Sequence, residues 1–554
     1  MSETDFDVVV IGSGAGGLTA AVALAQAGQK VLVCEQHYVP GGWCHSFTLE
    51  GYRFSPGVHY IGGIGPGGPM RAIYEGLGVS KDLAFCEINP DGLDHIIVSG
   101  EQFDIPKGRD KFAQRLKRRF PAEAEGIDGY LNAVTGITRD IWRLSRLKGT
   151  NDILRLPAVA PHALRWGLRT GRALINHFVT DPLLRAILAG QSGDHGLPPS
   201  QVAAPVHASI VNHYLDGGYY PLGGGFAIPR AFARALKRAG GELRLDTPVA
   251  RILLEGKQIV GVRLADGTEI RARHVISNAD PAVTFGRLIG RAQLSLRLRR
   301  KLDRVRYSVS ALSLFLAVDM DLRGAGLDSG NYWFYRHADL DRIYQEGLDS
   351  RFIQGGRPQS LFLTVTTLKD PSKLHSGHHT LEAFTFVGYD PFRRWAGGHE
   401  EKRPPEYLAL KRRLMTAMLE TADEIAPGLR DSAVFCDLGT PLTNEHYIAS
   451  TYGNLYGIAK SRFQVGPLAF PVRTEFDGLW MCGASTLGHG VAGATASGLS
   501  AAKHILQCRT AELLTAGGPE LQVYPSEDVS RWPARLRRRI HGRLRDLQRD
   551  TAVS

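Results

Sequence analysis

The chain of 554 residues has no apolar run of the roughly eighteen residues that a membrane-spanning helix requires. Its acidic N-terminus leads directly into a strand pattern and shows no secretory signal. The six cysteines are scattered, without C-x-x-C or metal-like spacing, which argues against a disulfide framework and a zinc module. The stretch HSGHH at 375–379 has loop-like flanks and no cysteine partner. We therefore expect a cytoplasmic protein with reduced thiols and no metal site.

Positive charge is concentrated near the C-terminus. The formal net charge is +11, and residues 531–550 hold eight arginines against two aspartates. The apolar residues that recur there every three or four positions are Trp532, Leu536, Ile540, Leu544 and Leu547. This spacing predicts a basic amphipathic helix that anchors the protein on the inner face of an anionic membrane, with a docked or solvated helix as the alternative. Nucleic-acid binding is not expected, because no aromatic platform or groove-reading motif accompanies the charge.

A dinucleotide-binding pattern opens the chain. The β-branched run Val8–Ile11 predicts a buried parallel strand, followed by a helix over 18–27. The glycines of G-x-G-x-x-G at the turn between them are Gly12, Gly14 and Gly17. They permit a tight turn, a close approach of backbone to a pyrophosphate, and close packing of helix on strand. A second strand, 30–34, leads to Glu35, which is placed to accept the ribose hydroxyls. Ala15 and Gln36 flank these positions and belong to the same predicted site.

Three further segments narrow the predicted nucleotide to FAD. A second glycine pair, Gly41 and Gly42, follows the ribose-binding acid, as in flavoproteins with two dinucleotide-binding domains. Residues 219–281 add a helix, a strand and a hairpin around an Asp-Gly turn. Residues 478–506 run from a strand through a glycine-rich loop into a helix whose N-terminal amides suit a reduced flavin. The FAD contacts predicted in these last two segments are Val249, Gly483, Gly490, Val491 and Gly493.

The FAD segments lie at the beginning, middle and end of the chain, which predicts an α/β fold with a discontinuous domain. A Rossmann-like FAD-binding domain would comprise residues 1–84, 216–284 and 456–510. An inserted α+β substrate domain would comprise 85–215 and 285–455, and 511–554 would be a basic tail.

Several longer motifs carry a resemblance to a known family. They are GSGAGGL, CEQHYVPGGWCHSF, GYRFSPGVHYIGG, GDHGLPPSQVAAPVHASIVNHYLDGGYYPLGGG and GTPLTNEHYIASTYGNLYG. Together they resemble the retinol saturase, carotenoid isomerase and phytoene desaturase superfamily of flavoproteins, over most of residues 6–507. The resemblance implies the fold shared with amine oxidases and GDP-dissociation inhibitors, FAD as cofactor, and a hydrophobic polyene or isoprenoid substrate. The C-terminal motif GLWMCGASTLGHGVAGATASG resembles isomerase and desaturase sequences as much as saturases, so reduction, desaturation and isomerisation stay open.

The inserted segments suit an elongated apolar substrate. Residues 312–318, 360–366 and 382–387 are predicted as strands that wall a tunnel, although most of their side chains are expected in the core. The basic, proline-interrupted stretch 154–188 resembles the membrane-facing entrance of family members that extract substrates from bilayers; ordinary helical packing is the alternative. Its apolar residues are Trp166, Leu174, Ile175, Phe178 and Ile187.

Four polar residues are candidate proton donors to a polyene carbon while a hydride reaches its neighbour. They are His59, Asp194, His195 and Tyr219. The histidines and the aspartate have the alternative of a hydrogen-bonded place in the core, and Tyr219 that of lining the tunnel. No second nucleotide fingerprint is present, so electrons would come from NAD(P)H that binds transiently or from another external donor.

We expect an FAD-dependent oxidoreductase that reduces a conjugated carbon–carbon double bond of a retinoid-, carotenoid- or polyene-like lipid. The alternatives are a carotenoid desaturase, a redox-neutral carotenoid isomerase, and a non-enzymatic lipid escort with the GDP-dissociation-inhibitor fold. The intact glycine motifs and Glu35 argue against the escort, which has no need of them.

Overall fold

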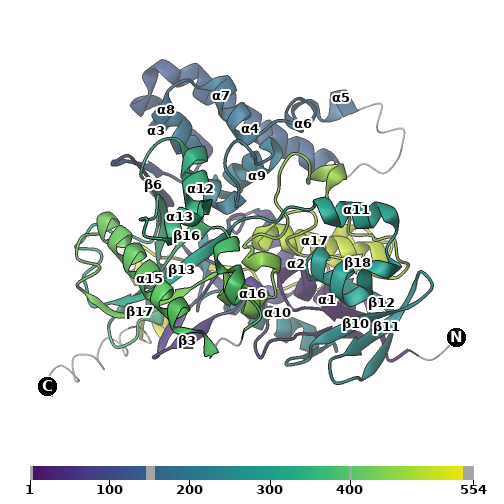
Figure 1. Ribbon diagram of the computed structural model, residues 1–554. Helices are drawn as coiled ribbons and strands as arrows, with labels where there is room; N and C mark the ends of the chain where they lie inside the picture. Colours follow the sequence, from purple (N-terminus) through teal and green to yellow (C-terminus); the bar gives the residue numbers. More distant parts are fainter. Residues whose placement is uncertain (1–3, 145–155, 399–401, 539, 541–554) are drawn as a thin grey trace.

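The computed structural model describes residues 4–144, 156–398, 402–538 and 540. Figure 1 shows three regions: a strand-rich part at the lower right, a second sheet at the lower left, and a layer of helices above them. In the described part of the chain, no helix combines the length and the apolar character needed to cross a bilayer.

The first region is built on a sheet, here called the parallel sheet. Its strands are β1 (Phe6–Ile11), β2 (Val31–Cys34), β9 (Glu242–Arg244), β10 (Val249–Glu255), β11 (Gln258–Leu264), β12 (Glu269–Ser277) and β18 (Leu479–Met481). The order is β10-β11-β12-β1-β2-β9, and β18 pairs with β12. Strands β9, β2, β1, β12 and β18 run parallel, while β10 and β11 extend the sheet as antiparallel strands. The predicted β1, β2 and Asp-Gly hairpin are confirmed.

Close helix packing on the parallel sheet depends on glycines. Helix α1 (Ala15–Gln26) packs against α17 (Gly490–Ile505) and α10 (Ala227–Arg238). A Cβ on Gly498 would lie 2.1 Å from the carbonyl oxygen of Gly16, so α1 and α17 approach backbone to backbone. The strands beneath are apolar and buried on both faces, as expected for parallel strands that helices cover.

The second region is a sheet rich in buried aromatic residues, here called the aromatic sheet. Its order is β17-β13-β16-β15-β14-β6-β7, and only β14 and β6 run parallel. The strands are β6 (Asp94–Val98), β7 (Glu101–Ile105), β13 (Ser310–Val318), β14 (Asn331–Tyr335), β15 (Ser360–Val365), β16 (His379–Val387) and β17 (Ala433–Gly439). The three strands predicted in this region correspond to β13, β15 and β16. Helix α15 (Pro405–Ile425) packs against β13, β15 and β17.

The upper helices bury most of the apolar residues predicted as a membrane entrance. The helices are α3 (Arg109–Arg119), α4 (Ala124–Leu144), α6 (Pro161–Trp166), α7 (Gly171–Phe178), α8 (Pro182–Leu188) and α9 (Ala204–Tyr214). Trp166, Leu174, Ile175 and Ile187 are buried in one core cluster, and Phe178 packs partly buried against it. Ordinary helical packing is therefore the interpretation that fits these side chains, and they are not available to a bilayer.

The C-terminal segment is packed against the folded body through residue 540. Strand β19 (Gln522–Pro525) pairs with β5 (Ala84–Glu87), which pairs with β8 (Tyr219–Pro221). The side chain of Trp532 is 2% exposed, and its Nε1 donates a hydrogen bond to the carbonyl of Pro525 at 2.7 Å. Ile540 is also buried, and Leu536 packs against the same core. The start of the predicted amphipathic stretch is thus docked, while Leu544 and Leu547 lie outside the described residues.

Candidate functional site

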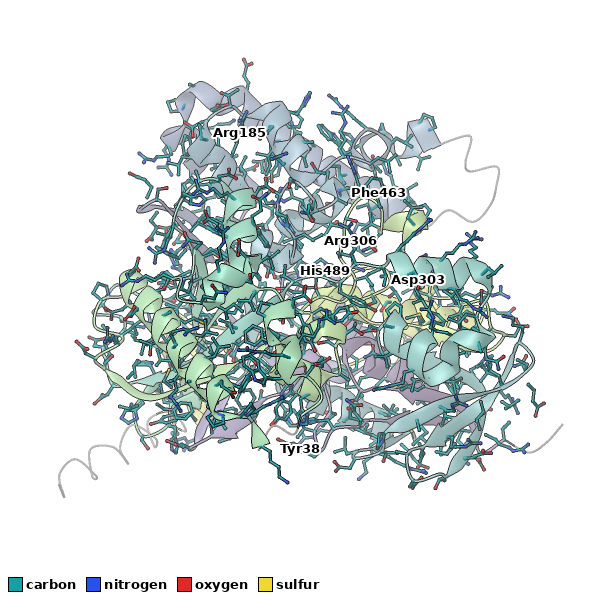
Figure 2. The ribbon with its side chains drawn as sticks, in the orientation of Figure 1. Tyr38, Arg185, Asp303, Arg306, Phe463 and His489 are labelled. Carbon is teal, nitrogen blue, oxygen red and sulfur yellow. The ribbon has the colours of Figure 1, made fainter. Side chains whose placement is uncertain are left out.

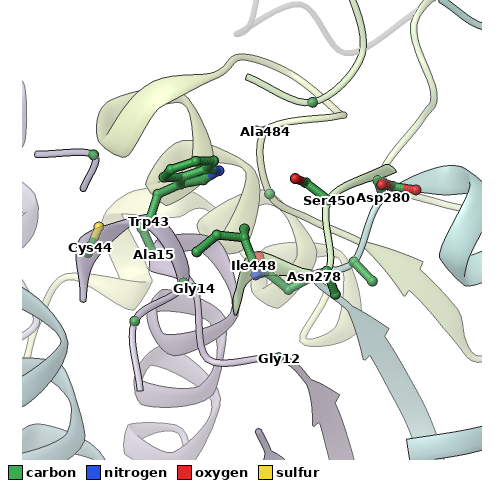
Figure 3. A pocket seen from close by; sticks show the side chains of 18 of the residues that line it. Gly12, Gly14, Ala15, Trp43, Cys44, Asn278, Asp280, Ile448, Ser450 and Ala484 are labelled. Carbon is green, nitrogen blue, oxygen red and sulfur yellow. The ribbon is translucent and has the colours of Figure 1, made fainter. Parts of the chain in front are cut away.

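A cavity lies where the carboxyl ends of parallel strands β1, β2, β12 and β18 meet the aromatic sheet. In parallel α/β sheets this edge is the usual place for a ligand. The predicted cofactor residues that line it are Gly12, Gly14, Ala15, Glu35, Gln36, Gly41, Gly42, Val249, Gly483, Gly490 and Val491. Figure 3 shows Trp43, Ile448 and Ser450 above the turn that carries Gly12 and Gly14. One cavity thus gathers residues from the beginning, middle and end of the chain.

Two predicted cofactor residues, Gly17 and Gly493, do not line the cavity. A Cβ on Gly17 would lie 2.2 Å from the carbonyl oxygen of Gly12, so this position serves the packing of α1 on its own turn. A Cβ on Gly493 would lie 2.3 Å from the carbonyl carbon of Gly488. Both glycines therefore shape the loops around the cavity without forming its wall.

Glu35 is held at the end of β2 by a network of short hydrogen bonds. Its Oε2 accepts from the backbone N–H of Ser13 at 2.8 Å and from the Ser13 hydroxyl at 2.5 Å. Its Oε1 accepts from the backbone N–H of His37 at 2.9 Å. Oε2 accepts two hydrogen bonds and Oε1 accepts one, so Oε1 retains a lone pair, and Glu35 lines the cavity. The carboxylate is therefore fixed in place with acceptor capacity left for ribose hydroxyls.

The turn around Gly14 fits a dinucleotide. Gly12 has φ +90°, which favours glycine, and Gly14 is the N-cap of α1. A Cβ on Gly14 would lie 2.5 Å from Nδ2 of Asn278, so a side chain here would collide at the cavity wall. Neither α1 nor α17 has a side-chain hydrogen bond at its N-cap, and the first residues of both helices line the cavity. Their free N–H groups suit a pyrophosphate and the negative charge of a reduced flavin.

Asn278 is a site residue that the sequence analysis missed. It follows β12 directly, and its backbone N–H donates to the carbonyl of Ile11 at 2.9 Å. Its side-chain Oδ1 accepts from the N–H of Gly17 at 3.1 Å, so it braces the first turn of α1. The available signal was its position, because a polar residue immediately after a buried parallel strand lies at the ligand edge of the sheet.

The opposite wall of the cavity comes from the aromatic sheet and its loops. Ala311 and Ser313 of β13 and Phe384 of β16 line it. The loop residues on this side are Tyr447, Ile448, Ala449, Ser450, Asn454, Leu455, Tyr456 and Gly457. This wall combines aromatic and aliphatic surface with a small number of polar groups, as is typical of sites for small apolar molecules.

Of the four predicted proton donors, only His59 lines the cavity. Its Nε2 lies 3.2 Å from Oε2 of Glu382, a carboxylate on β16. Its ring centroid lies 5.1 Å from that of Phe362 and 5.8 Å from that of Phe384. His59 therefore presents an ionisable ring among the aromatic and aliphatic side chains of this wall.

Asp194 lies outside the residues that line the cavity. Its Oδ2 accepts a hydrogen bond from the Tyr60 hydroxyl at 2.8 Å. Burial, together with the nearby charge of Asp94, raises the pKa of Asp194 to about 7. The backbone carbonyl of Asp194 lies 2.6 Å from Nε2 of His489, the residue that precedes α17. Figure 2 labels His489, near the centre of the molecule.

His195 and Tyr219 are placed away from the cavity and are not retained as proton donors. Neither ring nitrogen of His195 has a hydrogen-bond partner in the described part of the chain, and burial lowers the pKa of this side chain well below its usual value. Tyr219 is 1% exposed in β8, and its hydroxyl donates to the carbonyl of Asp216 at 3.1 Å. Both side chains are core residues, which for Tyr219 also excludes lining the cavity.

Comparison with known proteins places the chain in a family. The family model described as flavin-containing amine oxidoreductase matches residues 15–506. The chain belongs to this family. It is therefore an FAD-dependent oxidoreductase with a Rossmann-like cofactor fold, as the sequence analysis predicted.

Relatives at the level of sequence extend over most of the chain. All-trans-retinol 13,14-reductase of Danio rerio is 31% identical over 530 residues, covering 91% of this chain and 86% of the relative. Prolycopene isomerase 1 of an Oncidium hybrid is 27% identical over 517 residues, covering 90% and 84%. An oxidoreductase from Methanosarcina mazei has a similar fold, with a TM-score of 0.61 at 19% identity over 89% of this chain and 99% of that one.

Proposed function

We propose that this flavoprotein reduces a conjugated carbon–carbon double bond in a retinoid-, carotenoid- or polyene-like lipid. The observation that carries the proposal is that one cavity joins the glycine-rich cofactor turn to an apolar wall containing His59. The retinol reductase relatives, which match about nine-tenths of this chain, support the same substrate class.

The chemistry divides between the cofactor and the chain. FAD, once bound and reduced with two electrons by an external donor, would supply the hydride that forms one new C–H bond. Gly14, Glu35 and Asn278 hold the dinucleotide, and the N–H groups at the start of α17 stabilise negative charge at the flavin. His59 gives a proton to the adjacent carbon, so the double bond gains two hydrogens. The apolar side chains of the aromatic sheet that line the cavity would keep the reacting carbons in a largely apolar environment.

Redox-neutral isomerisation of a polyene is the second candidate, because prolycopene isomerases are also among the relatives. Desaturation is the reverse of the proposed reaction and uses the same cavity with an electron acceptor. The mass of the product distinguishes the three reactions. Reduction adds two hydrogens, desaturation removes two, and isomerisation leaves the mass unchanged.

The deciding experiment is anaerobic. The purified protein is reduced chemically and mixed with candidate polyenes while flavin reoxidation and product mass are followed together. We expect reoxidation at a rate set by the polyene and a product heavier by two hydrogens. If the reduced protein transfers nothing to any polyene while the oxidised protein desaturates a saturated precursor, the reductase proposal is wrong. Mixing the oxidised protein with NADH or NADPH in the same apparatus tests whether a nicotinamide is the external donor.

Contact with a membrane surface is proposed for a face that joins Leu168, from the predicted entrance stretch 154–188, to Phe463 from a distant loop. Leu168 and Phe463 are 70% and 66% exposed. The two side chains lie near the same place, where the start of α9 contacts both of their segments. The N–H of Ala204 donates to the carbonyl of Arg169, next to Leu168, and the N–H of Ala203 donates to the carbonyl of Lys460, three residues before Phe463. Arg462 lies 4.8 Å from the Phe463 ring. Figure 2 shows Phe463 on the flank below the helical layer. Exposed apolar side chains among arginines suit the surface of an anionic bilayer.

This face is tested by sedimentation with vesicles of phosphatidylcholine and phosphatidylserine. Leu168→Asp combined with Phe463→Asp should lower the bound fraction several-fold. Leu408→Asp, an exposed leucine on α15, is the matched control and should bind as the unchanged protein does. Equal binding by both variants would rule this face out as the contact.

A further inference from the structure

His59 is fixed from two directions by residues of the aromatic-sheet region. Its ring Nε2 faces Glu382 Oε2 at 3.2 Å, and its backbone carbonyl accepts a hydrogen bond from Lys369 Nζ at 2.7 Å. Lys369 is fully buried, and its Nζ also donates to Oδ1 of Asn331 at 2.5 Å. Ring and backbone of His59 are therefore both held by side chains far away in the sequence.

Glu382 is a buried carboxylate in the middle of β16, opposite Phe315 of β13 and Thr364 of β15. It is 2% exposed, and its Oε1 accepts the backbone N–H of Ser55 at 2.7 Å. Oε2 has no hydrogen bond within the described residues, and the charged or ionisable group that lies within ion-pair distance of it is the His59 ring, at 3.2 Å. Because an isolated buried carboxylate is costly, a positive charge on the His59 ring at this distance would stabilise Glu382, and the negative charge of Glu382 favours a ring orientation in which Nε2–H faces it.

Other charged groups lie close to Glu382. Lys369 and Lys373 are both buried and both feel its charge. Lys373 Nζ donates to the Tyr220 hydroxyl at 2.9 Å, and Lys369 Nζ is engaged by His59 and Asn331. Both ammonium groups are thus engaged elsewhere, while His59 is the group in direct contact with Glu382 Oε2.

The pairing decides which nitrogen of His59 faces the substrate. In a neutral imidazole one nitrogen carries hydrogen and the other does not, and the partner of each determines which. Nε2 faces a carboxylate, so it carries hydrogen. Nδ1 has no hydrogen-bond partner in the described part of the chain, and His59 lines the cavity. Nδ1 is therefore the nitrogen left for exchange of a proton with a bound molecule.

We propose that Glu382 is the positioning residue of His59, an inference that rests on the proposed reduction. Glu382 keeps hydrogen on Nε2, compensates the positive charge of the doubly protonated ring, and turns Nδ1 toward the cavity. The Nδ1–H bond breaks as a substrate C–H bond forms, and the neighbouring carbon receives the hydride. The ring is left neutral with Nε2–H on Glu382, and water returns the proton to Nδ1.

The test uses Glu382→Gln in the flavin-loaded protein, with two readouts. The first is ¹⁵N NMR of labelled histidine, in which His59→Gln identifies the His59 signals. The unchanged protein should show hydrogen on Nε2, and Glu382→Gln should mix this form with the form that carries hydrogen on Nδ1 alone. The second is polyene reduction: kcat should fall about 100-fold with KM nearly unchanged, and Glu382→Asp should recover part of the loss.

Asp140→Asn is the matched control, because Asp140 is a fully buried carboxylate that accepts the backbone N–H of His162 far from the cavity lining. It should alter stability without changing the His59 signals or the kcat of reduction. If Glu382→Gln behaves like Asp140→Asn in both readouts, Glu382 is only structural and the proposal is overturned.

The signals of the unchanged protein are decisive even if Glu382→Gln does not fold, since a His59 ring with hydrogen on Nδ1 alone would also overturn the proposal. If the unchanged protein reduces no polyene but the predicted NMR pattern appears, the proposed reaction fails while the pairing stands.

Discussion

The two walls of the cavity hold charge in different ways. On the parallel-sheet side the contacts are made mainly by backbone, and the one buried carboxylate, Glu35, is satisfied by N–H groups and a hydroxyl. On the aromatic-sheet side, ionisable side chains are buried. Some lie in contact with one another, and others accept hydrogen bonds from side-chain N–H groups. Asp94, for example, accepts hydrogen bonds from Asn331 Nδ2, Trp333 Nε1 and Gln191 Nε2. The first wall fits a fixed dinucleotide, while the second combines an apolar surface with buried ionisable side chains.

On the parallel-sheet side, here called the backbone wall, main-chain atoms make most of the contacts. Adding one side chain to this wall should prevent FAD binding. Gly14→Val should abolish FAD retention, because a Cβ at this position already lies 2.5 Å from Asn278 Nδ2 and the rest of the side chain would enter the cavity. The measurement is the ratio of flavin to protein absorbance after purification. Gly286→Val is the matched control, since a Cβ there meets no atom within 4 Å. A fully flavinylated Gly14→Val protein would show that this turn is not the dinucleotide site.

Removal of the single carboxylate of the backbone wall should weaken FAD without abolishing its binding. Glu35→Ala should cost about 1.5–3 kcal/mol, or roughly 10- to 150-fold in Kd, as is typical for hydrogen bonds to a charged group. Part of the loss would reflect the donors of Ser13 and His37 left without an acceptor. Titration of the apoprotein with FAD by fluorescence measures it. Glu242→Ala, at an exposed glutamate of β9, should leave Kd unchanged.

Buried acids of the aromatic-sheet side should make stability depend on pH. The pKa of Asp194 is raised from 3.8 to about 7 by burial and by the charge of Asp94, while the hydroxyls of Tyr60 and Tyr214 favour its ionised form. Between these pH values the native state keeps a proton that the unfolded chain has released. The free energy of unfolding should therefore fall as pH rises from about 4 to about 7.

Asp194→Asn should make that fall smaller, because an amide does not titrate. Urea denaturation at a series of pH values measures it, and Asp431→Asn, at an exposed aspartate, serves as the control. The same decline in both variants would mean that Asp194 is ionised in the native state throughout this range.

The smallest effect is expected at the C-terminal segment. Trp532 and Ile540 are buried and cannot enter a bilayer while docked, whereas Arg535, Arg537 and Arg538, in the described part of this segment, are exposed. Replacing Arg535, Arg537 and Arg538 by serine should lower vesicle binding slightly at low salt and not at high salt, with flavin content unchanged. A loss as large as that of the Leu168 and Phe463 double variant would make this segment the main anchor.

The backbone wall could be predicted from the sequence because its signals are local. Gly12, Gly14 and Glu35 lie within one strand–helix–strand unit, where their spacing alone fixes their places on the sheet edge. The helix at 490–505 was found in the same way, from a glycine-rich loop directly after a strand.

The second wall could not be predicted in the same detail, because it depends on strand register and on contacts between distant residues. His59 lies in the segment after β4 (Tyr52–Phe54), and Glu382 lies on β16. The two meet only because the register of β16 directs the Glu382 side chain toward that segment. Lys369 and Asp94 are charged residues, which a sequence pattern places on the surface, yet both are fully buried here. The docking of Trp532 was likewise hidden, since its apolar spacing fits a docked helix and a membrane-bound one equally well.

The position of β18 has a consequence for how the protein is made. This strand, Leu479–Met481, pairs with one edge of β12 while β1 pairs with the other edge, so the parallel sheet is complete only when segments from both ends of the chain have joined β12. Pairing over such separations folds slowly, and an unfinished sheet leaves strand edges open to aggregation. The glycine-rich turn after β1 is synthesised early. Helix α17, whose first residues also line the cavity, is synthesised late. We therefore expect flavin to bind near the end of folding, so that its supply during synthesis governs the yield of native protein.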